Sequence, residues 1–228
     1  MRKILCLLLT MLLLCPAASG AETPKYVALT FDDGPSGRFT QRLLEGLEER
    51  NARATFFLCG YRLEQYPQLV GDILVGGHEI GLHGYSHEDL SAMSRREIAE
   101  ELNRTRVLLP GDCRIRFLRT PGGKNSLAVE QVARAMGYGL LDWSMDPRDW
   151  ATRDAAAIGG SMIRKVRDGD VVLLHDMSES SVTAALNTVD ILSRQGFRFV
   201  TVSELARIRG AQIRPGQCYH SFPGEETE

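Results

Sequence analysis

Two pairs of side chains in this sequence have the types and spacing that metal binding and proton transfer need. Asp32 and Asp33 are adjacent and precede Gly34-Pro35, so they lie on a sharp turn where neighbouring side chains can point apart. One carboxylate could therefore bind a metal while the other accepts a proton. His83 and His87 are four residues apart, a spacing that would place both imidazoles on one side of a helical turn, as two ligands of one metal. The alternatives are a solvated turn and two ordinary histidines.

Three further polar clusters contain groups that could take part in a reaction. Arg119 begins the segment 119–123, Arg-Thr-Pro-Gly-Gly, where the guanidinium could pair with a carboxylate and free backbone N–H groups could face an oxyanion. Residues 146–150 read Asp-Pro-Arg-Asp-Trp, and His175 follows a strongly apolar segment as a candidate general acid. Taken singly, each has a plainer interpretation: a Pro-Gly turn, a charged loop with a half-buried Trp, and a core or capping His.

Apolar segments with strand character alternate with segments of helical periodicity along the chain. The expected strands are Tyr26–Phe31, Ala54–Leu58, Glu79–Leu82, Ile115–Leu118, Tyr138–Trp143, Val171–Leu174 and Phe197–Val202. The expected helices are Phe39–Leu47, Pro67–Val75, Ser94–Leu108 (opened by a capping box to Glu97), Leu127–Met136, Ile158–Val166, Val182–Arg194 and Ser203–Arg209. This alternation predicts an α/β fold with parallel strands, as an open doubly wound sheet or a (β/α) barrel.

The polar clusters coincide with the place where such folds carry their sites. Each of the five follows one of the expected strands, and sites in parallel α/β folds lie beyond the carboxyl ends of the strands. Random turns would not be expected to collect carboxylates, imidazoles and a guanidinium in one layer. The sequence therefore predicts a single site built from all five.

The amino-acid composition excludes some classes of function. The 228 residues include 43% hydrophobic and 25% charged residues, typical of one globular domain. Lys and Arg total 27 against 29 Asp and Glu, a net charge of -2. This balance excludes binding of nucleic acid through bulk positive charge and gives no polybasic segment for a membrane surface. We expect a monomer without a stable membrane anchor.

The ends of the chain have their own patterns. Residues 1–21 have a basic start, a short apolar run and small residues, which is typical of a secretory signal peptide cleaved after Gly20 or Ala21. We therefore expect the protein to be secreted or associated with the cell envelope. Residues 210–228 are expected to form a loosely ordered C-terminal tail.

Three cysteines lie beyond the predicted signal peptide: Cys59, Cys113 and Cys218. A disulfide is permitted outside the cytoplasm, and a Cys113–Cys218 bridge that ties down the tail is one possibility. An odd number leaves at least one thiol free.

The ordered motifs resemble those of a known enzyme family. Thr-Phe-Asp-Asp-Gly-Pro (30–35), His-Gly-Tyr-Ser-His (83–87), Arg-Thr-Pro-Gly-Gly (119–123), Asp-Pro-Arg-Asp-Trp (146–150) and Leu-Leu-His-Asp (173–176) are similar to the motifs of the NodB-homology polysaccharide deacetylases, carbohydrate esterase family four. The resemblance covers residues 25–209 and implies a single domain folded as a deformed (β/α) barrel.

The resemblance implies a role for each matching residue. Asp33, His83 and His87 would hold a divalent metal ion, with zinc expected and cobalt or manganese as alternatives. Asp32 would be the general base, positioned by Arg119. His175 would be the general acid, oriented by Asp149. The substrate would be contacted by Pro121, Gly122, Trp150 and Leu173, with a backbone N–H near Gly122 facing the oxyanion and with Trp150 and Leu173 lining the pocket for the acetyl methyl group.

The implied activity is metal-dependent removal of N-acetyl groups from N-acetylhexosamine residues of a glycan, with release of acetate. Peptidoglycan is the expected substrate, and chitooligosaccharides are the first alternative. A non-catalytic glycan-binding barrel and a small-molecule amidase of the same fold are further alternatives. The chain departs from the family pattern at Gly84, where members often have a Ser or Thr hydroxyl that braces the metal loop, and at Gly122, where they often have Tyr.

Overall fold

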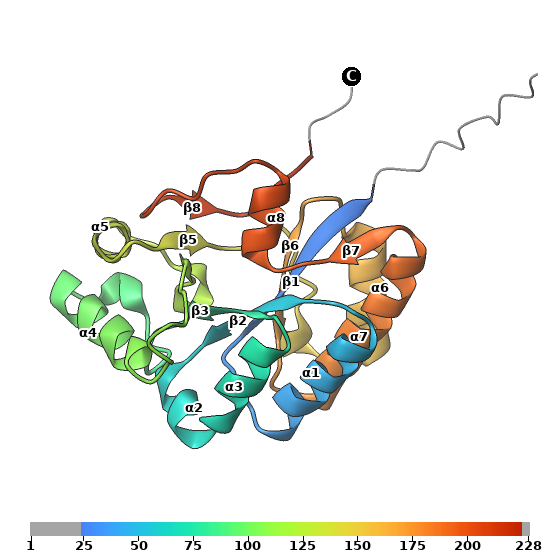
Figure 1. The fold of residues 1–228 in the computed structure, drawn as a ribbon, viewed down its shortest axis with the longest axis horizontal. Coiled ribbons are helices and arrows are strands. Elements are labelled where there is room, and N and C mark those ends of the chain that lie inside the picture. Colours follow the sequence, from blue (N-terminus) through green and yellow to red (C-terminus); the bar gives the residue numbers. More distant parts are fainter. Residues whose placement is uncertain (1–23, 225–228) are drawn as a thin grey trace, which may run out of the picture.

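The structure is a computed structural model that describes residues 24–224, and its paired strands form one curled parallel sheet (Figure 1). The strands are β1 (Lys25–Asp32), β2 (Ala54–Leu58), β3 (Glu79–Leu82), β4 (Phe117–Leu118), β5 (Gly139–Leu141), β6 (Val171–His175), β7 (Phe197–Phe199) and β8 (Cys218–Tyr219). Their order across the sheet is β6-β1-β2-β3-β4-β5-β8, and β7 pairs with the beginning of β1.

The helices lie around the outside of this sheet (Figure 1). They are α1 (Arg38–Glu49), α2 (Gly60–Gln65), α3 (Gln68–Val75), α4 (Arg95–Arg106), α5 (Leu127–Met136), α6 (Ala155–Lys165), α7 (Glu179–Arg194) and α8 (Val202–Ile208). The predicted capping box is present at α4, where the Ser94 hydroxyl accepts from the Glu97 N–H and the Glu97 carboxylate accepts from the Ser94 N–H.

The segment after β5 pairs with β6 and so connects the two ends of the curled sheet. Met145 forms an isolated parallel bridge with Val172, and its carbonyl accepts a hydrogen bond of 2.9 Å from the N–H of Leu173. The N–H of Ser144 donates to the carbonyl of Val171 at 3.0 Å. Short strands joined by this irregular pairing make a deformed (β/α) barrel, as predicted.

A buried apolar core fixes the strands that carry the site. β1 is buried from Val27 onward, and its Phe31 stacks on Phe56 of β2 with ring centroids 5.4 Å apart. The strand ends are polar, because Asp32 closes β1 and His175 closes β6 in the same register. The apolar interior thus places both groups in one layer at the carboxyl ends.

Helix α2 was not predicted from the sequence. It has six residues, too few for a clear helical period, and it begins directly after β2 with Gly60. A Cβ atom on Gly60 would lie 2.2 Å from the ring of Tyr85, so glycine permits the close approach of α2 to the loop that carries His83 and His87.

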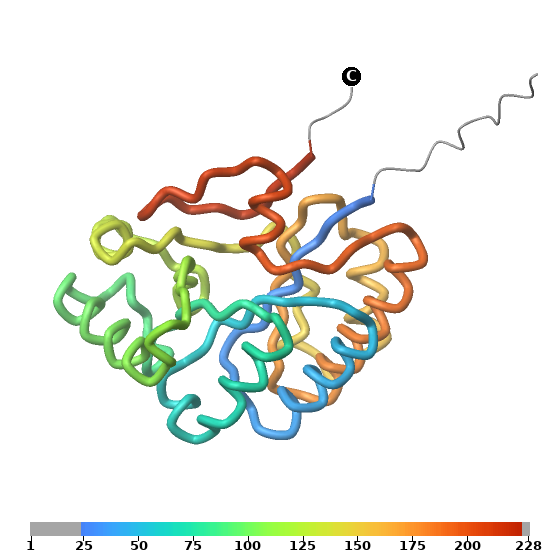
Figure 2. The backbone as a smooth tube through the Cα atoms, in the orientation of Figure 1, coloured from blue at the N-terminus to red at the C-terminus, as the bar shows by residue number. Residues whose placement is uncertain are grey.

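The C-terminal segment is more ordered than expected. Residues 218–219 form β8 beside β5, and Phe222 is buried, with its N–H donating to the carbonyl of Gly169 at 2.8 Å. Figure 2 shows this segment returning along the barrel. The expectation of loose order is therefore wrong from Cys218 to Phe222, because backbone pairing and one buried aromatic ring hold the segment. Cys59, Cys113 and Cys218 are all unpaired, so the Cys113–Cys218 bridge is not formed.

The predicted signal peptide, residues 1–21, lies wholly outside the residues that the structure describes, as do residues 225–228. Among residues 24–224, the structure contains no helix with the length and apolar character needed to cross a bilayer.

Candidate active site

The five polar clusters meet around one pocket of about 300 Å³ at the carboxyl ends of the strands. Its lining residues are Asp32, Asp33, His83, His87, Gly122, Trp143, Asp146, Trp150, Leu173 and His175. The predicted convergence is therefore present in the structure. Arg119 and Asp149 are buried behind the pocket, and each contacts one of its lining residues.

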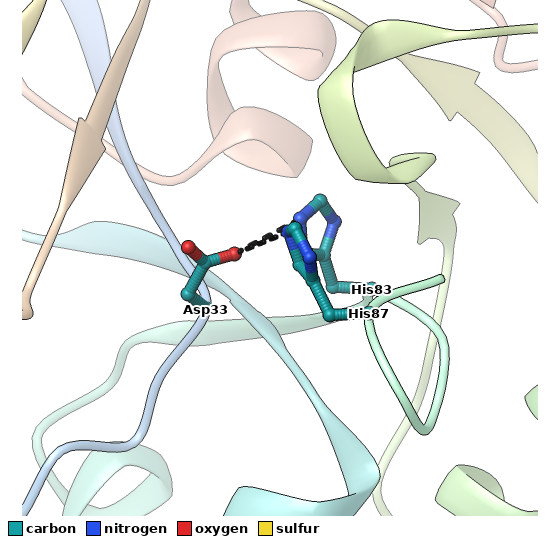
Figure 3. A group of neighbouring side chains, drawn as sticks. All are labelled: Asp33, His83 and His87. Carbon is teal, nitrogen blue, oxygen red and sulfur yellow. Dashed lines mark ion pairs between the residues drawn. The ribbon is translucent and has the colours of Figure 1, made fainter. Parts of the chain in front are cut away.

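Asp33, His83 and His87 converge as a three-donor group that could hold a metal ion (Figure 3). Asp33 Oδ1 lies 3.3 Å from His83 Nε2 and 3.0 Å from His87 Nε2. This oxygen is buried and yet accepts no hydrogen bond of acceptable geometry. A buried, unpaired carboxylate oxygen between two imidazole nitrogens fits a divalent cation, and one carboxylate with two imidazoles suits zinc or a similar ion.

Hydrogen bonding selects the nitrogen that His83 presents to this group. His83 Nδ1 lies 2.8 Å from the carbonyl oxygen of Arg119, which can only accept, so Nδ1 carries the proton. Nε2 is left with a free lone pair toward Asp33, as metal-binding histidines require.

The charges of this group are consistent with a metal site. Burial by itself raises the pKa of Asp33, but the adjacent imidazoles of His83 and His87 outweigh it and lower that pKa far below its usual range. Asp33 is thus a carboxylate, the form that binds a cation.

The two histidines are brought together by a loop and not by the predicted helical turn. Gly84 has φ of 78° and His87 has φ of 62°, so the backbone turns twice through the left-handed region between β3 and the following segment. The prediction of convergence was right and its structural reason was wrong. Gly84 suits this path because a residue without Cβ adopts positive φ at no steric cost.

A buried carboxylate braces this metal loop from outside. Glu101 of α4 is only 8% exposed, and its Oε2 accepts from the Tyr85 N–H (2.9 Å), the Ser86 N–H (2.8 Å) and the Ser86 hydroxyl (2.9 Å). The Thr105 hydroxyl donates to the carbonyl of Gly84 at 2.8 Å. These contacts hold the loop in which Gly84 replaces the Ser or Thr hydroxyl expected from the resemblance. Sequence reasoning missed Glu101 because a Glu on a helix looks like a surface residue.

Asp32 is held from behind by Arg119. Both are buried, and Arg119 Nη1 donates to Asp32 Oδ1 at 2.8 Å and to Thr30 Oγ1 at 2.7 Å. The other guanidinium nitrogens donate to the carbonyls of Leu141 (2.8 Å) and Asp142 (2.7 Å). Each of the three guanidinium nitrogens thus has a hydrogen-bond partner, and Nη1 faces a carboxylate, the form of Asp32 that accepts a proton.

His175 has a partner of the opposite charge to that of Asp32, because a buried carboxylate holds its imidazole. Its Nδ1 donates to Asp149 Oδ1 at 2.8 Å, and its backbone N–H donates to Asp149 Oδ2 at 2.8 Å. Burial lowers the pKa of His175, but the hydrogen bond and charge of Asp149, with the charges of Asp32 and Asp33, outweigh it and raise the pKa to about 9. His175 is therefore protonated at neutral pH, with Nε2–H free for the pocket.

Three of the four remaining predicted residues line the pocket. Leu173 and Gly122 line it, Trp150 stands at its rim with 59% exposure, and Pro121 is buried in the same turn as Gly122 without lining the pocket. Trp143 also lines the pocket and was missed, because its position in an expected strand gave no sign of its direction. Asp146 also lines the pocket, although the sequence predicted no role for this residue.

One glycine explains how Trp143 fits. A Cβ atom on Gly123 would lie 2.8 Å from the Trp143 ring. The glycine-rich turn therefore lets the indole pack closely against the backbone of residues 121–123.

Known proteins similar to this chain include polysaccharide deacetylases. The profile of the family "Polysaccharide deacetylase" matches residues 19–141. A peptidoglycan-N-acetylglucosamine deacetylase from Bacillus cereus is 37% identical over 81% of this chain and 90% of its own length. A chitooligosaccharide deacetylase from Sinorhizobium fredii is 35% identical over 90% of this chain and 93% of its own.

A solved structure shows the same fold. The family 4 acetyl xylan esterase from Clostridium thermocellum, in complex with a cobalt ion, aligns with a TM-score of 0.79 and 30% identity over 87% of this chain and 100% of its own. The convergent site, the matching profile and these relatives lead to one conclusion. The chain belongs to the polysaccharide deacetylases with NodB homology, carbohydrate esterase family four.

Proposed function

We propose that this chain hydrolyses the N-acetyl groups of N-acetylhexosamine residues in peptidoglycan, with zinc bound by Asp33, His83 and His87. One observation carries the proposal: a proton acceptor and a proton donor with opposite charge partners face the same pocket as the three-donor group. A non-catalytic barrel would need neither member of this pair. The relatives named as peptidoglycan deacetylases support the choice of polymer.

The protein's own residues divide the proton transfers between them. A divalent cation held by the three donors would supply Lewis acidity for an amide carbonyl and for nearby water. Asp32, fixed by Arg119, takes the proton of the water that attacks the acetamide carbon. His175 donates its Nε2 proton to the departing amine, which leaves as a glucosamine unit with acetate as the second product.

The pocket wall suits the acyl group of this substrate. Leu173 and Trp150 present apolar surface that can receive a methyl group. Gly122, with φ of 66° and open space where a Cβ would stand, leaves backbone accessible at the pocket, where an N–H can face the oxyanion. Removal of water around these groups strengthens the electrostatic contacts inside the pocket.

Mass spectrometry of glycans after incubation tests the proposal. Purified protein loaded with zinc should remove acetyl groups from peptidoglycan fragments, with free acetate appearing in equal amount. Failure to release acetate from both peptidoglycan fragments and chitooligosaccharides, with zinc, cobalt or manganese bound, would overturn the assignment. Elemental mass spectrometry of the protein as isolated identifies the metal.

Chitooligosaccharides are the second candidate substrate. The relative from Sinorhizobium fredii carries that name and is covered over 93% of its length. A higher kcat/KM on chitooligosaccharides than on peptidoglycan fragments would transfer the assignment to this class without changing the chemistry.

We also propose that the protein acts outside the cytoplasm. The basic, apolar and small-residue pattern of residues 1–21 supports export, as does a polymeric envelope substrate. Mass spectrometry of the mature N-terminus should find Ala21 or Glu22. A chain that keeps Met1 and stays in the cytoplasm would contradict export.

A further inference from the structure

We propose a second metal site, formed by Asp142, Cys218 and His220, that binds zinc or another thiophilic divalent cation at the edge where β5 meets β8. These three residues are the other group in the described part of the chain whose possible ligand atoms all lie within 4.8 Å of one another. They lie outside the set that lines the active-site pocket, and the deacetylation proposed above does not use their side chains.

The distances between the donors approach those of a tetrahedral zinc site. Cys218 Sγ lies 3.3 Å from Asp142 Oδ2 and 3.8 Å from His220 Nε2. With one ligand atom from each residue, the three atoms lie within 4.8 Å of one another. With bond lengths of about 2.0–2.3 Å, neighbouring ligands of a tetrahedral ion are about 3.3–3.8 Å apart. A cation therefore fits between the three side chains after small rotations.

Backbone pairing holds the donors in place before any ion binds. Leu140 pairs with Cys218 and Leu141 with Tyr219, and the N–H of Asp142 donates to the carbonyl of Tyr219 at 2.9 Å. Asp142 follows β5 and His220 follows β8, so the ladder itself brings them together. Little chain entropy would be lost on binding, which favours affinity.

A neighbouring amide orients the carboxylate as metal sites require. Asn125 Nδ2 donates to Asp142 Oδ2 at 3.1 Å and lies 3.7 Å from Cys218 Sγ. Supporting donors of this kind fix ligand geometry in metalloproteins. His220 has a side chain 60% exposed, so solvent can reach the fourth position and an ion can enter.

The ligand types of the cluster determine which cations it prefers. A divalent cation stabilises the thiolate that binds it. Thiolate and imidazole together favour zinc or cobalt over magnesium or manganese, in contrast with the carboxylate and two imidazoles of the active site.

The proposed ion would tie the C-terminal segment to the barrel near the active site. The carbonyl of Asp142 accepts from Arg119 Nη2, while its side chain faces Cys218. One residue thus joins the C-terminal strand to the guanidinium that holds Asp32. We expect the ion to stabilise β8 and to take no part in proton transfer.

Cobalt spectroscopy tests the site at equilibrium. Reduced, metal-free protein titrated with Co²⁺ should develop the near-ultraviolet charge-transfer band of a thiolate–cobalt bond and bind two ions per chain. The band should persist in His87→Ala, which disrupts the active-site group, and in Cys113→Ser, which removes a different thiol. It should vanish in Cys218→Ser, and each of Cys218→Ser and His87→Ala should bind one ion.

His220→Ala gives an independent measurement in case Cys218→Ser does not fold, because its side chain is mostly exposed. It should weaken the band and reduce the rise in Tm that Zn²⁺ causes. No thiolate band at saturating Co²⁺, or a band that survives Cys218→Ser, would overturn the proposal and leave a hydrogen-bonded cluster only. Both readouts are independent of deacetylase activity.

Discussion

Two ion pairs at the pocket each join a carboxylate to a basic side chain, in opposite order. In one, the carboxylate of Asp32 faces the pocket and the guanidinium of Arg119 lies behind it, with Asp32 Oδ1 2.8 Å from Arg119 Nη1. In the other, the imidazole of His175 faces the pocket and the carboxylate of Asp149 lies behind it, with His175 Nδ1 2.8 Å from Asp149 Oδ1.

The difference explains how neighbouring groups can do opposite chemistry at one pH. A permanent cation favours an anion in front of it, and a buried anion favours a cation in front of it. Asp32 is thereby suited to accept a proton and His175 to donate one. We infer that the buried partner, Arg119 or Asp149, sets the direction of proton transfer at each group, and not the residue type alone.

The largest expected effect comes from removing the acceptor. Asp32→Asn keeps the size of the side chain but removes the basic carboxylate, so kcat should fall by about 1,000-fold or more. Bound metal should stay near the wild-type amount, because Asp33, His83 and His87 are intact. Acetate release and elemental mass spectrometry of the same sample measure both. Asp72→Asn, an exposed change on α3, is the matched control. Loss of the metal in Asp32→Asn would mean that Asp32 is a ligand.

Removing the donor should cost less. His175→Gln should lower kcat by about 100-fold, because the site is partly exposed and water can replace the imidazole to some degree. The loss should be smaller for a synthetic acetamide or ester with a good leaving group, which needs no proton. Steady-state kinetics on the two substrate types measure the ratio. An equal loss on both would argue against His175 as the general acid.

The smallest effect on catalysis should come from a change that leaves the Asp32–Arg119 and His175–Asp149 pairs intact. Glu101→Ala removes the brace of the metal loop, and changes of this kind lower metal affinity by about 10- to 100-fold. At saturating metal the pH profile should be that of the wild type. Isothermal titration with Zn²⁺ measures the affinity, with Glu100→Ala on the exposed face of α4 as control. A shifted pH profile would show that Glu101 also acts on one of the pairs.

The sequence predicted which residues meet at the site, but it did not predict the strand and side chains that hold them in place. Each predicted cluster lies in or after a strand on the carboxyl side of the sheet, where the order of polar clusters and the alternation of elements suffice to place it. The pairing of β8 with β5 could not be seen, because a two-residue strand has no period and its order comes from distant backbone groups. The tail was therefore misjudged.

The loop of residues 83–87 shows the same limit on a smaller scale. Spacing indicated that His83 and His87 would meet, but a helical turn and a loop with two residues at positive φ satisfy the same spacing. Glu101 and Trp143 could not be predicted because their importance depends on which way a side chain points. That direction is decided by packing between elements and not by local sequence.

The pH dependence of kcat in Asp149→Asn is the most direct test of the claim that the buried partner sets the role. The alkaline limb of the wild type should reflect deprotonation of His175, whose pKa Asp149 raises against the effect of burial. Without the charge of Asp149 that pKa falls, so the protonated donor is lost sooner as pH rises. The alkaline limb should move to lower pH by about one unit or more, with the acid limb unchanged. An alkaline limb that stays in place, or a shift confined to the acid limb, would contradict the account.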